Sequence, residues 1–251
     1  MANPFSLDGK VALVTGGNVG LGQAIAVALA EAGADIVSTS RRPAPETKAR
    51  VEGLGRRFLG IEADLGSTKP IAGIVEQTLS AFGQLDILVN NAGIIRRNDS
   101  VEFTEDDWDA VIDTNLKSAF FLAQAAARHM IARGRGKIIN IASMLSFQGG
   151  IRVPSYTASK SGLAGITKLL ACEWASKGIN VNAIAPGYMT TDNTKALRAD
   201  QKRNSEILGR IPAGRWGEPS DLGGAAVFLA SAASDYVHGA IIPVDGGWLA
   251  R

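Results

Sequence analysis

A serine, a tyrosine and a lysine stand close together in the middle of this 251-residue sequence, in an order that permits acid–base chemistry. They are Ser143, Tyr156 and Lys160. On a helix, two residues four positions apart project from one face, about 6 Å apart along the axis. A phenol has a pKa of about 10, and a nearby ammonium favours the phenolate. The pattern predicts that Tyr156 exchanges a proton with a substrate hydroxyl, while Ser143 hydrogen-bonds the substrate oxygen.

The same residues also have ordinary interpretations. A tyrosine and a lysine at this spacing are, in isolation, most often a solvated helix face, and a serine is more often a turn or helix cap than a catalyst. Ser143 is a poor candidate for an acyl-transfer nucleophile, because no G-x-S-x-G elbow surrounds it and no histidine is suitably placed. Catalysis therefore depends on the elements that position the three side chains.

Short apolar runs alternate along the chain with longer stretches of helical periodicity. The runs are residues 11–14, 35–38, 58–61, 86–89, 137–141, 180–184 and 241–244. Strands that are apolar along their whole length belong to a parallel sheet covered on both faces. We predict an α/β fold with one Rossmann-type doubly wound sheet of about seven parallel strands and helices on both faces. The ligand is expected at the carboxyl ends of the strands, at the switch point.

Composition excludes several functions. The chain has 26 Lys and Arg residues against 24 Asp and Glu, a net charge of +2, which gives no broad surface for nucleic acid. The single cysteine precludes an internal disulfide, and two distant histidines give no zinc-ligand spacing, so no metal is expected. No apolar stretch approaches the roughly 18 residues of a membrane span. We expect a cytoplasmic protein without a membrane partner.

A glycine-rich turn follows the first predicted strand. Residues 15–22 read Thr-Gly-Gly-Asn-Val-Gly-Leu-Gly and run into a good helix-forming stretch. Glycines at such a junction let the backbone approach a pyrophosphate, which then lies against the free N–H groups of the helix. The spacing is G-x-x-x-G-x-G, so it differs from the common G-x-G-x-x-G pattern. The turn predicts a bound nucleotide.

Further motifs follow in a specific order: Asn90-Asn-Ala-Gly93, then Asn115, the Ser143, Tyr156 and Lys160 set, and Pro186-Gly187 with Thr191. In order and spacing they resemble the short-chain dehydrogenase/reductase family, from residue 10 to residue 247. The resemblance implies an NAD(P)-dependent oxidoreductase, with hydride leaving or reaching the substrate carbon as Tyr156 moves the proton. It implies that Asn115 holds a water near Lys160. The catalytic residues are then Asn115, Ser143, Tyr156 and Lys160.

The resemblance also implies the cofactor site. Its residues are Gly16, Asn18, Val19, Gly20, Leu21, Gly22, Ser40, Arg41, Asp64, Leu65, Asn91, Ala92, Gly93, Tyr156, Lys160, Pro186, Gly187 and Thr191. We expect Lys160 and the positive charge of an oxidised nicotinamide to lower the Tyr156 pKa together. After the second strand, residues 38–42 contain no carboxylate and two arginines, which favours NADP or tolerance of both cofactors. The branch that the chain resembles is generally NAD-linked, so the choice between NAD and NADP stays open.

That branch acts on deoxy sugar acids in pectin and uronate breakdown, and the resemblance lies in residues 93–97, 143–160, 182–189, 210–217 and 245–251. It implies oxidation of a secondary alcohol of 2-deoxy-D-gluconate or 2-dehydro-3-deoxy-D-gluconate. The carboxylate of such a small-molecule substrate suits a guanidinium fork. We expect substrate contacts from Arg97, or its neighbour Arg96, and from Ser143, Gln148 and Arg152.

Other specificities in the same chemistry remain open, such as gluconate 5-dehydrogenase or 3-oxoacyl reductase. A non-catalytic dinucleotide-sensing module is a more remote alternative. Residues 1–251 are expected to form one NAD(P)-binding catalytic domain, with a substrate lid at about 188–215. The family resemblance further implies a homotetramer. The apolar segment 239–244 and Trp248 would suit its interface or, equally, the core.

Overall fold

The computed structural model describes residues 3–251, which form one seven-stranded sheet in the order β3-β2-β1-β4-β5-β6-β7. All six neighbouring pairs are parallel. The strands are β1 (Val11–Thr15), β2 (Asp35–Ser40), β3 (Phe58–Glu62), β4 (Ile87–Asn90), β5 (Gly136–Ile141), β6 (Ile179–Pro186) and β7 (Ile241–Val244). The predicted fold class is confirmed, and each predicted strand overlaps an observed one.

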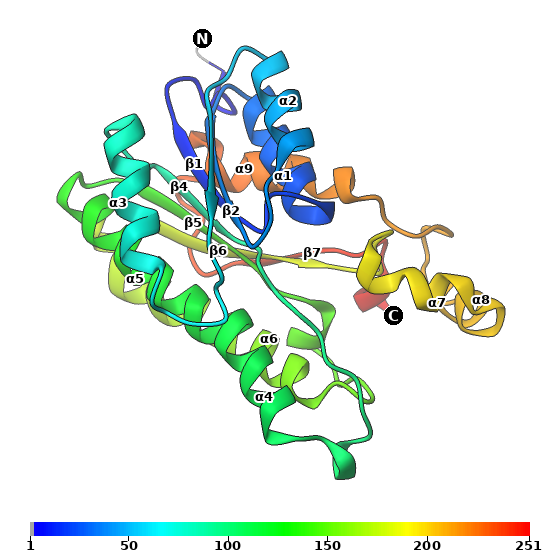
Figure 1. Ribbon diagram of the computed structural model, residues 1–251. Helices are drawn as coiled ribbons and strands as arrows, with labels where there is room; N and C mark the ends of the chain where they lie inside the picture. The colour runs from blue at the N-terminus through cyan, green and yellow to red at the C-terminus, as the bar shows by residue number, and fades with distance from the viewer. Residues whose placement is uncertain (1–2) are drawn as a thin grey trace.

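Helices cover both faces of the sheet (Figure 1). They are α1 (Gly20–Glu31), α2 (Pro45–Gly53), α3 (Ile71–Phe82), α4 (Glu105–Ile112), α5 (Ser118–Ala132), α6 (Pro154–Trp174), α7 (Lys195–Ala199), α8 (Gln201–Leu208) and α9 (Gly223–Ala230). Side chains of α3, α5 and α6 share one buried core with the sheet, and those of α1 and α9 share a second. Successive strand residues enter opposite cores, which explains why the strands are apolar throughout.

The switch point of the sheet lies between β1 and β4, since β1 pairs with β2 on one side and β4 on the other. Thr15, at the end of β1, fixes the backbone beyond β4. Its hydroxyl oxygen accepts hydrogen bonds from Asn91 N at 2.9 Å and Ala92 N at 2.8 Å. Asn91 returns a side-chain bond to Thr15 O at 2.8 Å. These bonds bring the loops after β1 and β4 together at the carboxyl edge.

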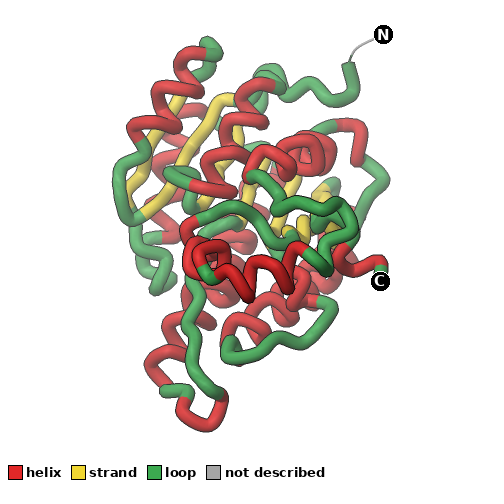
Figure 2. Tube along the Cα trace, turned by 90° about the vertical axis from the view of Figure 1, so that its right-hand side faces the viewer, coloured by secondary structure: helices red, strands yellow, loops and turns green. Residues whose placement is uncertain are grey.

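The segment 188–215 lies beyond the ends of β6 and β7 and includes α7 and α8, which face the viewer in Figure 2. It packs against other parts of the chain through a small buried cluster. That cluster consists of Ile207 and Ile211 of the segment together with Met144, Trp216 and Trp248. Trp248 is 4% exposed, so it belongs to the core of its own chain. Within residues 3–251, no helix has both the length and the apolar character that would let it cross a membrane.

Candidate active site

The glycine turn leaves the start of α1 open to an anion. Val19, the residue before the helix, is extended and its side chain accepts no hydrogen bond from the helix N–H groups, and the first turn has no acidic residue. A Cβ on Gly22 would overlap the Gly16 carbonyl and the Asn91 side-chain amide. Gly16 has a φ of +66°, a conformation that suits glycine. The close approach of backbone and the free helix N–H groups fit a dinucleotide pyrophosphate.

The segment after β6 lies at the same edge of the sheet as this turn. Thr191 lies beside Gly20, where an added Cβ would be 3.9 Å from the threonine methyl. Gly187 follows β6 and leaves no space for a side chain, because its Cβ would be 2.6 Å from the Asp245 Cα. The structure therefore brings Gly187 and Thr191 to the same edge as the glycine turn, as their predicted cofactor contacts require.

The predicted adenosine contacts come from the ends of β2 and β3. Ala63 N donates to Ser40 O at 3.0 Å, which places Asp64 beside the loop that follows Ser40. One oxygen of Asp64 accepts a bond from Gly66 N at 2.9 Å. Leu65 is 6% exposed and belongs to the core. The two strand ends thus form a continuous border with the glycine turn.

Asn115 lies in a π-helical turn, Asp113–Lys117, between α4 and α5. Asn115 is the buried residue of this π-helical turn. Such turns are frequent at functional sites. The Asn115 amide accepts from Ile94 N at 2.8 Å and donates to Ile94 O at 2.9 Å and to Ser159 Oγ at 3.3 Å. Asn115 therefore connects the loop after β4 to the helix that carries Tyr156 and Lys160.

Lys160 is buried on α6, only 4% exposed. Its ammonium donates to Ile141 O, at the end of β5, over 2.6 Å. Burial lowers the Lys160 pKa from 10.5 to about 8. Its Nζ lies 5.6 Å from the centre of the Tyr156 ring, so the two side chains share one face of the helix as predicted.

The pKa of Tyr156 differs from our expectation. Desolvation raises it, while a hydrogen bond with Ser143 and the charge of Arg97 lower it. We expected Lys160, with the cofactor, to lower this pKa; the protein's own groups leave it above the ordinary value, and Lys160 is not among the groups that lower it. The largest cause of the raised pKa is burial, which penalises the charged phenolate.

Ser143 is both a cap and a partner of Tyr156. Its hydroxyl oxygen accepts a bond from Leu145 N at 3.2 Å, at the start of the short helix Met144–Ser146. Its proton stays available for the phenol, because a hydroxyl accepts and donates at once. Ser143 can therefore cap the short helix and contact the Tyr156 phenol at the same time.

The candidate substrate arginines lie on two loops that the structure joins. Asn98 N donates to Arg152 O at 3.1 Å, and Arg152 pairs with Asp99 at 3.0 Å. Arg152 has a φ of +62°, an uncommon conformation for a residue with a side chain. Arg97 is exposed; its guanidinium donates to Asn193 O at 3.2 Å, and its charge acts on Tyr156.

Two contacts could not be predicted from the sequence. Arg96 forms an ion pair with Asp107 at 3.1 Å, whereas its neighbour Arg97 contacts Asn193 O. The two adjacent arginines therefore have different partners. Gln148 accepts a bond from Trp248 Nε1 at 3.3 Å, from 100 residues further along the chain. No spacing rule links residues that far apart. Ser159 was also missed, although its position three residues after Tyr156 on one helix gave a signal.

A doubly wound parallel sheet, an open glycine turn at its switch point and a Ser–Tyr–Lys group at its carboxyl edge define a dinucleotide-dependent oxidoreductase. Residues 16–249 match the family model described as enoyl-(acyl carrier protein) reductase. The chain belongs to the short-chain dehydrogenase/reductase family.

Individual relatives show which members of the family the chain resembles. The chain is 64% identical over 248 residues to the 2-dehydro-3-deoxy-D-gluconate 5-dehydrogenase of Escherichia coli K12, covering 98% of each protein. It resembles an Agrobacterium tumefaciens crystal structure with bound NADP, provisionally described as a 2-deoxy-D-gluconate 3-dehydrogenase, at 63% identity, a TM-score of 0.94 and full coverage of both chains. It also resembles a gluconate 5-dehydrogenase from Burkholderia cenocepacia J2315 in complex with NADP and tartrate, at 42% identity, a TM-score of 0.95 and coverage of 99% and 98%.

The tight glycine turn yields a first prediction. Gly22→Ala should weaken dinucleotide binding at least about tenfold, because the new methyl group displaces Gly16 or Asn91 from the pyrophosphate cradle. Titration of reduced dinucleotide fluorescence measures the affinity. Gly53→Ala is the matched control, since a Cβ there meets nothing within 4 Å. Unchanged affinity in Gly22→Ala would contradict the assignment of this turn.

The buried lysine yields a second. Because the Lys160 pKa falls from 10.5 to about 8 on folding, the unfolded chain binds more protons between those values. The free energy of unfolding of the wild type should therefore rise with pH across that window. Relative to Lys160→Met, the gain should approach about 3 kcal/mol. Urea unfolding of both proteins at pH 7.5 to 10 measures it, and parallel pH profiles would count against a buried, shifted lysine.

Proposed function

We propose that this protein oxidises a secondary alcohol of a deoxy sugar acid with NAD(P), the substrate being 2-dehydro-3-deoxy-D-gluconate or 2-deoxy-D-gluconate. The observation that carries the proposal is the 64% identity, over 98% of both chains, to a 2-dehydro-3-deoxy-D-gluconate 5-dehydrogenase. In this chain, contacts at the carboxyl edge of the sheet link Asn115, Ser143, Tyr156 and Lys160, the set expected to carry the chemistry.

Tyr156 is the proton acceptor in the direction of oxidation. Ser143 contacts the phenol and orients the substrate oxygen beside it. Lys160, with a pKa of about 8, gains and loses a proton near neutral pH and can pass one on from the phenol. Asn115 fixes the backbone at Ile94 and the side chain of Ser159 around this relay. The bound dinucleotide would supply the hydride acceptor and a positive charge that favours the phenolate.

Arg97 is the proposed anchor for the substrate carboxylate. It is the arginine whose charge acts on Tyr156, so an acid held by it lies within reach of the catalytic phenol. Its bond to Asn193 O connects the same side chain to the proposed lid, residues 188–215. A lid that closes over the acid would exclude water from the hydride step. Gln148 and Arg152 are proposed to border the rest of the substrate.

Gluconate 5-dehydrogenase is the second candidate. It is favoured by the similarity to the Burkholderia enzyme, whose structure holds tartrate, a small hydroxy acid. Its identity of 42% is well below the 64% of the first candidate. We further propose that residues 1–251 form one catalytic domain and that the protein is a cytoplasmic homotetramer in pectin degradation. The half-buried edge strand β7 supports an interface between copies.

The direct test mixes purified protein with NAD or NADP and each sugar acid, and follows the absorbance of reduced nicotinamide. Turnover with either deoxy sugar acid, in preference to gluconate, is the expected result. Tyr156→Phe should lower kcat by at least about a hundredfold, because the phenol that accepts the proton is gone. Its dinucleotide affinity should stay close to that of the wild type. Equal turnover in the mutant would overturn the mechanism and favour a dinucleotide-sensing module.

The carboxylate anchor has its own test. Arg97→Ala should raise the KM for the sugar acid by about tenfold or more, since a charge-assisted hydrogen bond is lost. Arg96→Ala is the matched control, because that neighbour pairs with Asp107. Steady-state kinetics of both variants, with the acid and with an uncharged polyol, separate the effects. If Arg97→Ala left the KM for the acid unchanged, the anchor would lie elsewhere.

A further inference from the structure

The short helix Met144–Ser146 is joined to α6 by two serines that are not among the predicted site residues. They are Ser146, the last residue of the short helix, and Ser161, which lies on α6. We propose that these two serines form a clamp that positions the Ser143 hydroxyl against the Tyr156 phenol. Both act through other groups, so they are positioning residues. The inference rests on the proposed function and deepens it, because it concerns the proton transfer assigned to Tyr156.

The clamp consists of one hydrogen bond in each direction. The Ser146 hydroxyl donates to the Lys160 carbonyl oxygen at 2.7 Å. The Ser161 hydroxyl donates to the Leu145 carbonyl oxygen at 3.1 Å. The bonds therefore join two neighbouring residues of the short helix to two neighbouring residues of α6. A single bond would let the short helix rotate about it, whereas two bonds side by side fix its orientation as well as its distance.

Lys160 holds both ends of the segment that carries Ser143. Its ammonium donates to Ile141 O at 2.6 Å, at the end of β5, and its carbonyl oxygen accepts the bond from Ser146. Ser143 lies between these two points, and its own carbonyl oxygen accepts a bond from Ser146 N at 2.9 Å. Tyr156 precedes Lys160 by about one turn of the same helix. The clamp therefore fixes Ser143 relative to Tyr156.

Packing on the other sides of the short helix does not replace the clamp. Met144 is buried, but the cluster around it includes Ile207 and Ile211 of the proposed lid, and a lid that opens and closes changes such contacts during turnover. In the loop that follows, Phe147 and Ile151 are 50% and 75% exposed, so this loop has little packing to offer. In contrast, α6 shares a large core with the sheet. The clamp thus attaches the catalytic serine to an element that belongs to that core.

The position of the Ser143 hydroxyl affects the ionisation of the phenol. Burial is the largest influence on the Tyr156 pKa and raises it, whereas the hydrogen bond with Ser143 lowers it. The charged groups beside the phenol are Arg97, whose charge also lowers this pKa, and Lys160, whose Nζ lies 5.6 Å from the ring centre. Without the clamp, the Ser143 hydroxyl leaves its place and the bond that favours the phenolate weakens. The Tyr156 pKa then rises further, and less phenolate accepts the substrate proton at a given pH.

The clamp is tested with the double variant Ser146→Ala/Ser161→Ala. Ionisation of the phenol is followed in the protein without substrate, as tyrosinate absorbance after rapid pH jumps. The Tyr156→Phe version of each protein subtracts the other two tyrosines. The Tyr156 pKa of the double variant should lie at least about 0.5 above that of the wild type. Its kcat for sugar-acid oxidation at neutral pH should fall about three- to tenfold, while its dinucleotide affinity stays unchanged.

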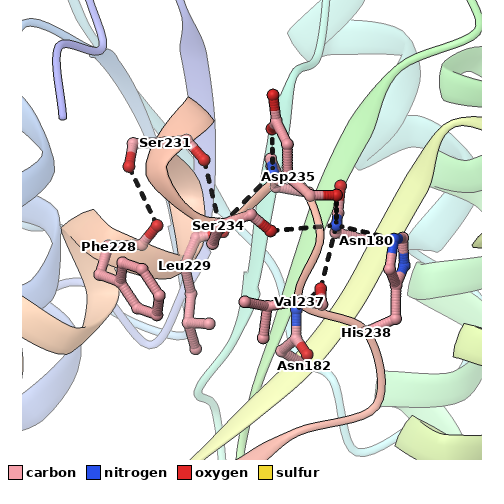
Figure 3. Close-up of polar contacts among 10 residues, drawn as sticks. Asn180, Asn182, Phe228, Leu229, Ser231, Ser234, Asp235, Val237 and His238 are labelled. Atoms are coloured by element: carbon pink, nitrogen blue, oxygen red, sulfur yellow. Dashed lines mark hydrogen bonds and ion pairs between the residues drawn. The ribbon is translucent and has the colours of Figure 1, made fainter. Parts of the chain in front are cut away.

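Ser234→Ala is the matched control. It removes a buried serine hydroxyl that lies 3.1 Å from the carbonyl oxygens of Leu229 and Ser231. These polar contacts precede β7, at the edge of the sheet opposite the site (Figure 3). The control should lose stability in urea unfolding but keep the Tyr156 pKa and the kcat of the wild type. The conservative variant Ser161→Thr, which keeps a hydroxyl at an exposed position, should also behave as the wild type.

A Tyr156 pKa that is the same in the double variant and the wild type would overturn the proposal. An equal rise of this pKa in Ser234→Ala would also overturn it, because the effect would then follow from lost stability alone. A wild type that oxidises no sugar acid, together with the expected rise of the Tyr156 pKa in the double variant, would count against the proposed function and support the clamp.

Discussion

The site depends on the close approach of three backbone segments at the switch point. Gly22 allows α1 to begin against the Gly16 carbonyl, and Asn91 fills the remaining space with its amide. Thr15 then satisfies two backbone N–H groups beyond β4 with one hydroxyl. Because these bonds connect β1, β4 and α1, the glycine turn and the loop after β4 form one packed unit. Every other part of the site is placed relative to it.

Burial favours the neutral forms of Tyr156 and Lys160, whereas a surface ion pair would favour their charged forms. Desolvation raises the pKa of Tyr156 and lowers that of Lys160, so in both residues the neutral form gains. The protein itself therefore favours a protonated phenol, beside a lysine that loses its proton more readily than a lysine in water. The positive charge of a bound oxidised cofactor would favour the phenolate, so the proposed proton abstraction by Tyr156 would depend on the cofactor being bound.

Much of this arrangement could be predicted from the sequence, because parallel strands are apolar throughout and their ends carry the chemistry. The seven strands, the glycine turn and the Tyr156–Lys160 pair all follow from local patterns. The Tyr156 pKa was not predictable, because it depends on desolvation by segments distant in sequence. The π turn at Asn115 and the bond from Arg97 to Asn193 O also result from tertiary packing. Spacing rules do not reach such contacts.

Trp248 makes the surroundings of the proposed substrate site depend on residues 248–251. Its indole donates to Gln148, packs edge-on against Tyr188 at 4.8 Å, and lies under the Arg210 guanidinium at 4.0 Å. Arg251 donates to Gly209 O at 2.7 Å. These few residues thus connect the loop after Ser143 to α8. A carboxypeptidase that trimmed them would leave the sheet and the glycine turn intact, while loosening the contacts that hold Gln148, Tyr188 and α8 around the proposed substrate site.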